Sequence, residues 1–147
     1  MSEMPDETEL AARVVERMMA ADAFSHWLGV EVAEVQPRRA VCRMTVRPEM
    51  LNGFGVSHGG VVFSLADSAF AFACNTHGRV TVSIENSITY PAPVQAGDVL
   101  TAVAEEETAS RRLSYYTVRV HNQEQRLVAS FRGTAYQTSR PHFPQMP

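Results

Sequence analysis

The chain of 147 residues has few cysteines, no excess of positive charge and no long apolar run. Its two cysteines, Cys42 and Cys74, lie in apolar contexts and lack the C-x-x-C spacing of metal and redox sites. This pattern indicates reduced core residues of a cytosolic protein, without a disulfide or a metal site. The net charge of -3 at pH 7 gives no basic footprint for nucleic acid, so we expect no nucleic-acid partner.

Targeting and membrane signals are also missing from the sequence. The first ten residues, MSEMPDETEL, are acidic, whereas a secretory signal begins with positive charge followed by an apolar run. The longest nearly apolar stretch, residues 61–74, is too short to span a bilayer. We therefore expect a cytoplasmic protein with no membrane partner. The length suits one domain with a proper core, and there is no internal repeat.

The periodicity of the apolar residues predicts two helices followed mainly by strands. Residues 7–20 place Leu10, Val14 and Met18 at helical spacing, and Asp22 is a candidate cap for a short second helix. Strand-like patterns follow at residues 30–37, 39–47, 79–90, 98–107, 112–122 and 125–137. The order of helix, two strands, buried helix and four strands indicates an antiparallel sheet in an α+β domain.

The segment 51–75, LNGFGVSHGGVVFSLADSAFAFACN, is the most informative part of the chain. A glycine-rich loop leads into a helix that is apolar around most of its circumference, which is typical of a buried helix. Its polar residues, Ser64, Asp67, Ser68 and Asn75, fall on one narrow stripe. This pattern predicts a sheet wrapped around the helix, with one edge open to a cleft or to a second subunit.

Asp67 and the backbone amides of Gly59 and Gly60 suggest a catalytic site. A lone carboxylate in an apolar helix is costly to bury, and amides at a helix N-terminus can stabilise developing negative charge. A carboxylate and such amides are the fewest groups that the hydrolysis of an ester or a thioester needs. The alternative is structural: Asp67 accepts hydrogen bonds from Ser64 or Ser68, and the glycines only permit tight packing.

The residues of this segment resemble a known family. The motifs LNG at 51–53, HGG at 58–60 and FSLAD at 63–67 resemble the PaaI-type phenylacetyl-CoA thioesterases of the hotdog fold. Gly97-Asp98 before a strand also fits. The resemblance covers residues 22–138 and implies a hotdog domain there. Helical spacing predicts a helical segment within residues 1–21, and the proline-rich residues 139–147 predict a flexible tail.

The resemblance implies an enzyme that hydrolyses acyl-CoA, either aryl-acetyl-CoA such as phenylacetyl-CoA or a medium-chain thioester. Asp67 would be the general base or nucleophile, and the Gly59 amide would polarise the thioester carbonyl. Asn52 would hold the substrate or the water, and Ser83 would orient the attacking water. The family assembles as homodimers paired into homotetramers and needs no cofactor and no metal.

The spacing of Gly59 and Asp67 adds a geometric argument. Eight positions on one helix correspond to about 12 Å along its axis. A base and an oxyanion donor must both lie within about 3 Å of the reacting group. If both act, Gly59 of one subunit must serve the same thioester as Asp67 of another, so the chemistry requires a dimer.

Further residues are candidates for secondary roles. His58 either belongs to the catalytic set or bonds the loop backbone, which is the interpretation we favour. Asn52 with Gly53 also fits an ordinary turn, and Ser83 fits strand packing. Arginine suits phosphate geometry, although arginines near a turn are usually just solvated. Candidate substrate contacts are Gly60, Ser64 and Ser68 on the helix, Phe54 and Tyr90 at an acyl pocket, and Arg111 and Arg112 at the CoA phosphates.

Two other functions compete with thioester hydrolysis. Hotdog hydratases or dehydratases pair a histidine with an acid, and His58 precedes Asp67 by nine positions, so the two would meet only across a dimer. A non-catalytic acyl-CoA sensor would need an appended module or a missing acid, and the chain shows neither. Hydration of an enoyl-CoA would support the first alternative, and CoA binding without turnover would support the second.

Overall fold

The computed structural model describes residues 6–144 and begins with two helices. Helix α1 (Glu7–Ala21) starts at Asp6, whose carboxylate accepts the Glu9 N–H at 2.7 Å. Helix α2 (Ala23–Leu28) starts at Asp22, which accepts the Ser25 N–H at 2.9 Å. Both carboxylates satisfy amides that a first helical turn leaves free. The predicted cap at Asp22 is therefore confirmed.

The strands form one antiparallel sheet in the order β1-β2-β4-β5-β6-β3. Their number and sequence order match the prediction, and a short 3-10 turn, η1 (Pro48–Met50), follows β2. Strands β1 and β3 are the two edges of the sheet. The bounds are β1 (Glu31–Gln36), β2 (Arg39–Thr45), β3 (Arg79–Thr89), β4 (Val99–Ala109), β5 (Leu113–His121) and β6 (Leu127–Pro141).

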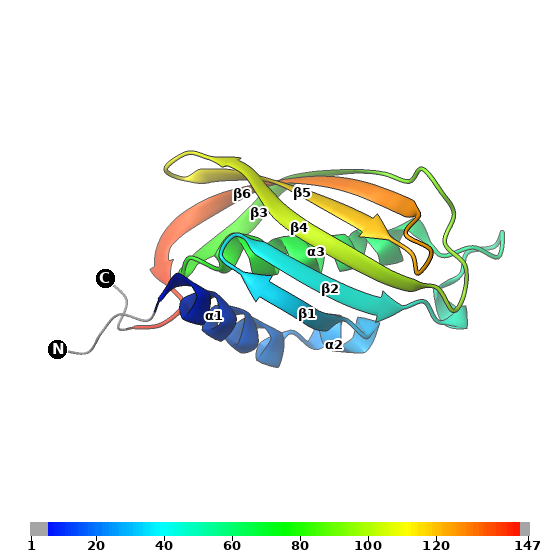
Figure 1. The fold of residues 1–147 in the computed structure, drawn as a ribbon, viewed down its shortest axis with the longest axis horizontal. Helices are drawn as coiled ribbons and strands as arrows, with labels where there is room; N and C mark the ends of the chain where they lie inside the picture. Colours follow the sequence, from blue (N-terminus) through cyan, green and yellow to red (C-terminus); the bar gives the residue numbers. More distant parts are fainter. Residues whose placement is uncertain (1–5, 145–147) are drawn as a thin grey trace.

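The sheet curves over the long helix α3 (Gly59–Asn75), while α1 and α2 lie along its other side (Figure 1). Phe70 of α3 is fully buried, and its ring centroid lies 5.6 Å from that of Tyr116 and 5.7 Å from that of Phe131. A Cβ on Gly133 would come within 2.7 Å of the Phe70 ring, so glycine lets β6 approach the helix closely. The predicted hotdog arrangement is confirmed.

The C-terminal boundary differs from the prediction. Strand β6 continues to Pro141, which pairs with Arg79 across the edge, and His142 N–H donates to Gly78 O at 2.8 Å. Residues 139–142 are therefore part of the domain, and the prediction of a flexible tail beginning at residue 139 is wrong for them. Residues 1–5 and 145–147 of the predicted terminal segments lie outside the described residues.

Cys42 and Cys74 are buried free thiols, as their apolar contexts predicted. Burial raises the pKa of each to about 12, which keeps both protonated and unreactive. Within residues 6–144, no helix has the length and apolar character needed to cross a membrane.

Candidate active site

The N-terminal end of α3 leaves one backbone amide without an acceptor. His58 caps the helix, and its Nδ1 accepts the Gly60 N–H at 3.4 Å, while its own N–H donates to Met50 O at 2.8 Å. No acceptor within residues 6–144 takes the Gly59 N–H. A free amide at this position, assisted by the helix dipole, suits a carbonyl oxygen that gains negative charge.

Gly59 also lies against Tyr90. The Tyr90 hydroxyl donates to Gly59 O at 2.9 Å, and a Cβ at Gly59 would lie 3.2 Å from the tyrosine ring. Both residues line a cavity of about 340 Å³ whose other walls are mainly apolar: Val56, Ser57, Val62, Ala92, Pro93 and Val94. Tyr90 therefore lines an apolar cavity, and its contact with the acyl group stays a prediction.

Asp67 is half-buried in the middle of α3, and its carboxylate accepts no hydrogen bond from any group in residues 6–144. Desolvation by burial, followed by the negative charge of Asp22, raises the pKa of Asp67 above its usual range. A partly desolvated carboxylate without donors is a stronger base than an exposed one, as expected of a group that takes a proton near neutral pH.

The serines beside Asp67 have other partners. Ser64 Oγ donates to Gly60 O at 2.7 Å, one helical turn earlier. Ser68 Oγ lies 2.8 Å from Ser25 Oγ, and Ser25 Oγ donates to Asp22 at 2.6 Å, so a buried chain links α3 to α2. The structural alternative, in which these serines satisfy Asp67, is wrong for the described chain. Ser68 is buried in this contact, away from any open cleft.

Asn52 closes the glycine-rich loop as a turn residue. Its Oδ1 accepts the Phe54 N–H at 2.9 Å and the Val56 N–H at 3.4 Å, which is an Asx-type turn. Phe54 at the loop tip is 93% exposed and does not line the cavity beside Gly59. Within one chain, Phe54 therefore does not contribute to the predicted acyl pocket.

Strand β3 runs back along α3, from its C-terminal end to its N-terminal end. Thr81 N–H donates to Asn75 Oδ1 at 2.8 Å, and Tyr90 at the far end of the strand contacts Gly59. Ser83 lies near the Thr81 end, about 23 Å from Tyr90 at 3.3 Å per residue. Ser83 is exposed and donates to Asn86 Oδ1 at 2.9 Å. Within one chain, Ser83 and Gly59 therefore lie far apart.

Arg111 and Arg112 lie in the β4–β5 turn, at the same end of the sheet as Ser83. Arg112 Nη1 donates to Tyr136 Oη at 3.4 Å, and Tyr136 pairs with Val82 at the start of β3. The structure does not bring these arginines near Gly59 of the same chain. Their predicted contact with CoA phosphates stays a prediction.

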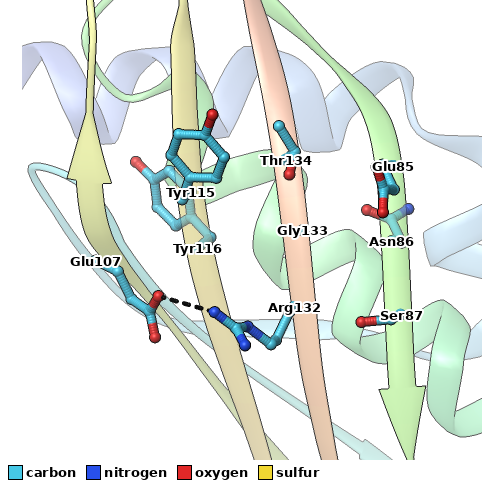
Figure 2. Close-up of a pocket in the computed structure, with 9 residues that line it drawn as sticks. All are labelled: Glu85, Asn86, Ser87, Glu107, Tyr115, Tyr116, Arg132, Gly133 and Thr134. Carbon is cyan, nitrogen blue, oxygen red and sulfur yellow. Dashed lines mark ion pairs between the residues drawn. The ribbon is translucent and has the colours of Figure 1, made fainter.

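A second cavity, of about 240 Å³, lies on the face of the sheet that points away from α3 (Figure 2). Arg132 and Glu107 form an ion pair of 3.6 Å across it, beside Tyr115. None of the predicted catalytic residues lines this cavity. Within residues 6–144, no group of three or more histidine, cysteine or carboxylate side chains has an arrangement that could hold a metal ion.

Sequence reasoning missed two contacts at this site. Asp22 was assigned only as a helix cap, but its charge acts on Asp67, which lies 45 positions later in the chain. The hydrogen bond from Tyr90 to Gly59 O was also unforeseen. No local pattern signals either contact, because both join elements that meet only in the folded chain.

Residues 54–129 match the model of the thioesterase superfamily. A curated relative, the acyl-coenzyme A thioesterase PaaI of Escherichia coli, is 40% identical over 119 residues, which cover 81% of this chain and 85% of the relative. The family match, over residues 54–129, includes α3 and strands β3, β4 and β5.

Solved structures agree with the sequence matches. The structure of the E. coli PaaI protein from the phenylacetic acid degradation operon superposes with a TM-score of 0.90 at 36% identity, covering 92% of this chain and 99% of that one. A hypothetical thioesterase from Streptococcus pneumoniae, solved with coenzyme A, gives a TM-score of 0.73 at 27% identity, covering 77% and 91%.

Proposed function

The chain belongs to the thioesterase superfamily and is a thioester hydrolase, and on this premise we propose that it hydrolyses acyl-CoA to a free acid and CoA. One observation carries the proposal. Within residues 6–144, the half-buried carboxylate of Asp67 has no hydrogen-bond donor, and it lies on the helix whose first amide, that of Gly59, has no acceptor. These are the base and the oxyanion donor that thioester hydrolysis requires.

The relatives support the choice of substrate class. The E. coli relative is named an acyl-coenzyme A thioesterase, its structure is tied to phenylacetic acid degradation, and the streptococcal relative was solved with coenzyme A. The apolar cavity beside Gly59 and Tyr90 suits an aromatic or medium-chain acyl group. We propose phenylacetyl-CoA or a hydroxylated form as the first substrate to test.

The site needs two subunits. Gly59 and Asp67 lie about 12 Å apart along one continuous helix, which is too far for both to touch one thioester. We propose that Asp67 and Ser83 of one subunit act with Gly59 and Asn52 of its partner in a homodimer. Two solved variants of the streptococcal relative replace an aspartate and a threonine with the same sequence separation as Asp67 and Ser83.

In the proposed reaction, the thioester carbonyl oxygen accepts the Gly59 N–H, and the helix N-terminus stabilises its developing charge. Asp67 removes a proton from water, the water oxygen attacks the carbonyl carbon, and the carbon–sulfur bond breaks. The proton then passes from Asp67 to the CoA sulfur. Alternatively, Asp67 attacks directly and water opens the resulting anhydride.

The first experiment follows thiol release from phenylacetyl-CoA, hydroxyphenylacetyl-CoA and medium straight-chain acyl-CoAs with wild type and Asp67→Asn. We expect turnover by wild type and a loss of about a thousandfold or more in the variant. The matched control is Glu124→Gln, which removes an exposed carboxylate in the β5–β6 turn and should act like wild type.

Other results would change the assignment. Equal turnover by Asp67→Asn and wild type would remove Asp67 from the mechanism. Hydration of an enoyl-CoA without thiol release would favour the hydratase alternative. A single turnover in ¹⁸O-water tests for the anhydride route. If water opens the anhydride at the Asp67 carbonyl, ¹⁸O enters Asp67 and the released acid carries none, whereas direct attack by water on the thioester places ¹⁸O in the acid.

A further inference from the structure

The C-terminal end of α3 gathers positive charge that the proposed reaction does not use. The chain has 13 arginines and no lysine. Figure 1 shows α1, the β1–β2 turn and the end of β6 near the C-terminal end of α3, and several of the arginines belong to these elements. We name the set the α3-end cluster, and its members are Arg13, Arg17, Arg38, His77, Arg140 and His142.

Contacts join the members of the cluster. The guanidinium carbons of Arg13 and Arg17 lie 4.7 Å and 5.2 Å from the centroid of the same Phe143 ring. His142 Nε2 lies 2.7 Å from Oδ1 of Asn75, the last residue of α3.

The β1–β2 turn and β3 join the cluster from the other side of the helix end. Arg38 N–H donates to Oγ1 of Thr76, which follows the last residue of α3. His77 Nε2 lies 3.3 Å from Thr81 Oγ1 at the start of β3. Three segments far apart in the sequence thus place their cations around one helix end.

The arginines of this cluster lack ion pairs within residues 6–144, although Glu9 and Glu16 lie within about one helical turn of Arg13 on α1. None of Arg13, Arg17, Arg38 and Arg140 forms an ion pair there, and all four are exposed. Glu106 approaches the cluster, since its N–H donates to Arg38 O, but its carboxylate accepts from Tyr116 Oη at 3.2 Å. The dipole of α3 adds only about half a negative charge at this end.

Arg13 and Arg17 illustrate the imbalance. They stand four positions apart on α1, where like charges repel, and both guanidinium groups approach one ring. Desolvation, and then the charges of His77, Arg17 and Arg140, lower the pKa of His142, so this neighbour stays neutral near pH 7. A bound anion would relieve the repulsion between the arginines.

We propose that the α3-end cluster binds the phosphate groups of the acyl-CoA substrate. This inference rests on the proposed function. Arginine forks fit phosphate oxygens, and the CoA nucleotide carries several phosphate charges. Asp67 lies about 12 Å along α3 from Asn75, a span that the long pantetheine arm between thioester and phosphates can bridge. The predicted contacts Arg111 and Arg112 lie at the same end of the sheet.

The test compares Arg13→Gln/Arg17→Gln with a control of equal charge change, Arg119→Gln/Arg126→Gln. The control removes two exposed arginines on β5 and in the β5–β6 turn, outside the cluster. Steady-state kinetics are measured on phenylacetyl-CoA and on phenylacetyl-N-acetylcysteamine, which has the same thioester and no phosphate. Unfolding temperatures confirm that all variants are folded.

We expect the cluster variant to raise KM for phenylacetyl-CoA about tenfold, with kcat unchanged and no change on the phosphate-free thioester. The KM of the wild type should also rise with salt more steeply than that of the variant. An unchanged KM, or an equal loss on both thioesters, would overturn the proposal. Arg38→Gln/Arg140→Gln repeats the test if the first variant is unstable.

Calorimetric titration with CoA separates this proposal from the proposed function, because it needs no turnover. Weaker CoA binding by the cluster variant would support the site even if no thioester were hydrolysed. Tight binding of inorganic pyrophosphate or of a single-stranded oligonucleotide, with no preference for CoA, would overturn the assignment to CoA.

Discussion

The two ends of α3 differ in how their backbone groups are satisfied. At the C-terminal end, Thr76 and Tyr116 both donate to Ala73 O, and the Asn75 side chain bonds Ala71 O and Thr81 O. At the N-terminal end, the Gly59 amide has no acceptor in the described chain and faces an apolar cavity. One end is completed by its own side chains, whereas the other keeps a donor for a ligand.

This difference indicates where the helix contributes to stability and where it contributes to chemistry. A helix end without partners is costly unless water or a ligand supplies them. Changes at the Gly59 end should therefore affect kcat more than stability, and changes to the side chains that complete the Asn75 end should affect stability more than kcat.

Among changes at the two ends of α3, the largest effect should follow Gly59→Ala. The new Cβ would lie 3.2 Å from the Tyr90 ring, so either the ring or the helix start must move, and the amide moves with it. We expect kcat/KM to fall by roughly tenfold to a hundredfold, because an oxyanion donor acts only in position. The control is Gly53→Ala, because a Cβ at Gly53 would have no neighbouring atom within 4 Å. Equal kinetics of Gly59→Ala and wild type would argue against the amide role.

Asn75→Ala should have the opposite balance of effects. The side chain is buried, and its loss leaves Thr81 N–H and O without their partner. We expect the free energy of unfolding to fall by about 2 kcal/mol, measured by urea denaturation, with kcat nearly unchanged below the melting range. A large loss of turnover in a folded variant would contradict this division of roles.

Asp22→Asn should change the pH dependence of turnover. The charge of Asp22 raises the pKa of Asp67, so its removal lowers that pKa and keeps the base ionised at lower pH. We expect the acid limb of the kcat/KM profile to move to lower pH, while asparagine still caps α2. Asp6→Asn changes the equivalent cap of α1 and should leave the profile in place. An unmoved limb in Asp22→Asn would remove Asp22 from the site.

The smallest effect should be a gain in stability from Asp67→Asn. The pKa of Asp67 is raised in the folded chain. The wild type therefore loses stability as the pH rises from the ordinary pKa of aspartate through the raised pKa of Asp67 in the folded chain. Thermal unfolding of the variant should therefore occur at higher temperature at neutral pH and at the same temperature in strong acid. A lower melting temperature at neutral pH would indicate a structural role for Asp67.

Much of the fold was predictable because local patterns specify it. Strict alternation identified β2, and the nearly continuous apolar surface of α3 identified a buried helix. The end of β6 was not predictable. Residues 137–141 are polar or proline and carry no alternation, but their backbone pairs with β3 at Arg79 and Thr81. Hydrogen-bonded pairing at a sheet edge leaves little trace in side-chain chemistry.

The sequence predicted which residues form the candidate site, but not which residues contact them. The stripe of Ser64, Asp67 and Ser68 was correct, but the partner of Ser68 is Ser25 on another helix. The α3-end cluster was equally hidden, since Arg13, Arg38 and Arg140 lie far apart in the sequence. Spacing along one helix reveals a shared face, but it does not reveal which other element packs on that face.

The sequence by itself determined the helix that carries Gly59 and Asp67 and the distance between them. Backbone hydrogen bonding fixes the rise per residue, so the separation of Gly59 and Asp67, on which the proposal of two subunits rests, followed from spacing alone. Only the tertiary structure decided that Asp22 acts on Asp67, that Tyr90 bonds Gly59 O, and which arginines meet at the other helix end. These contacts depend on how the sheet and the N-terminal helices pack around α3, which no local pattern encodes.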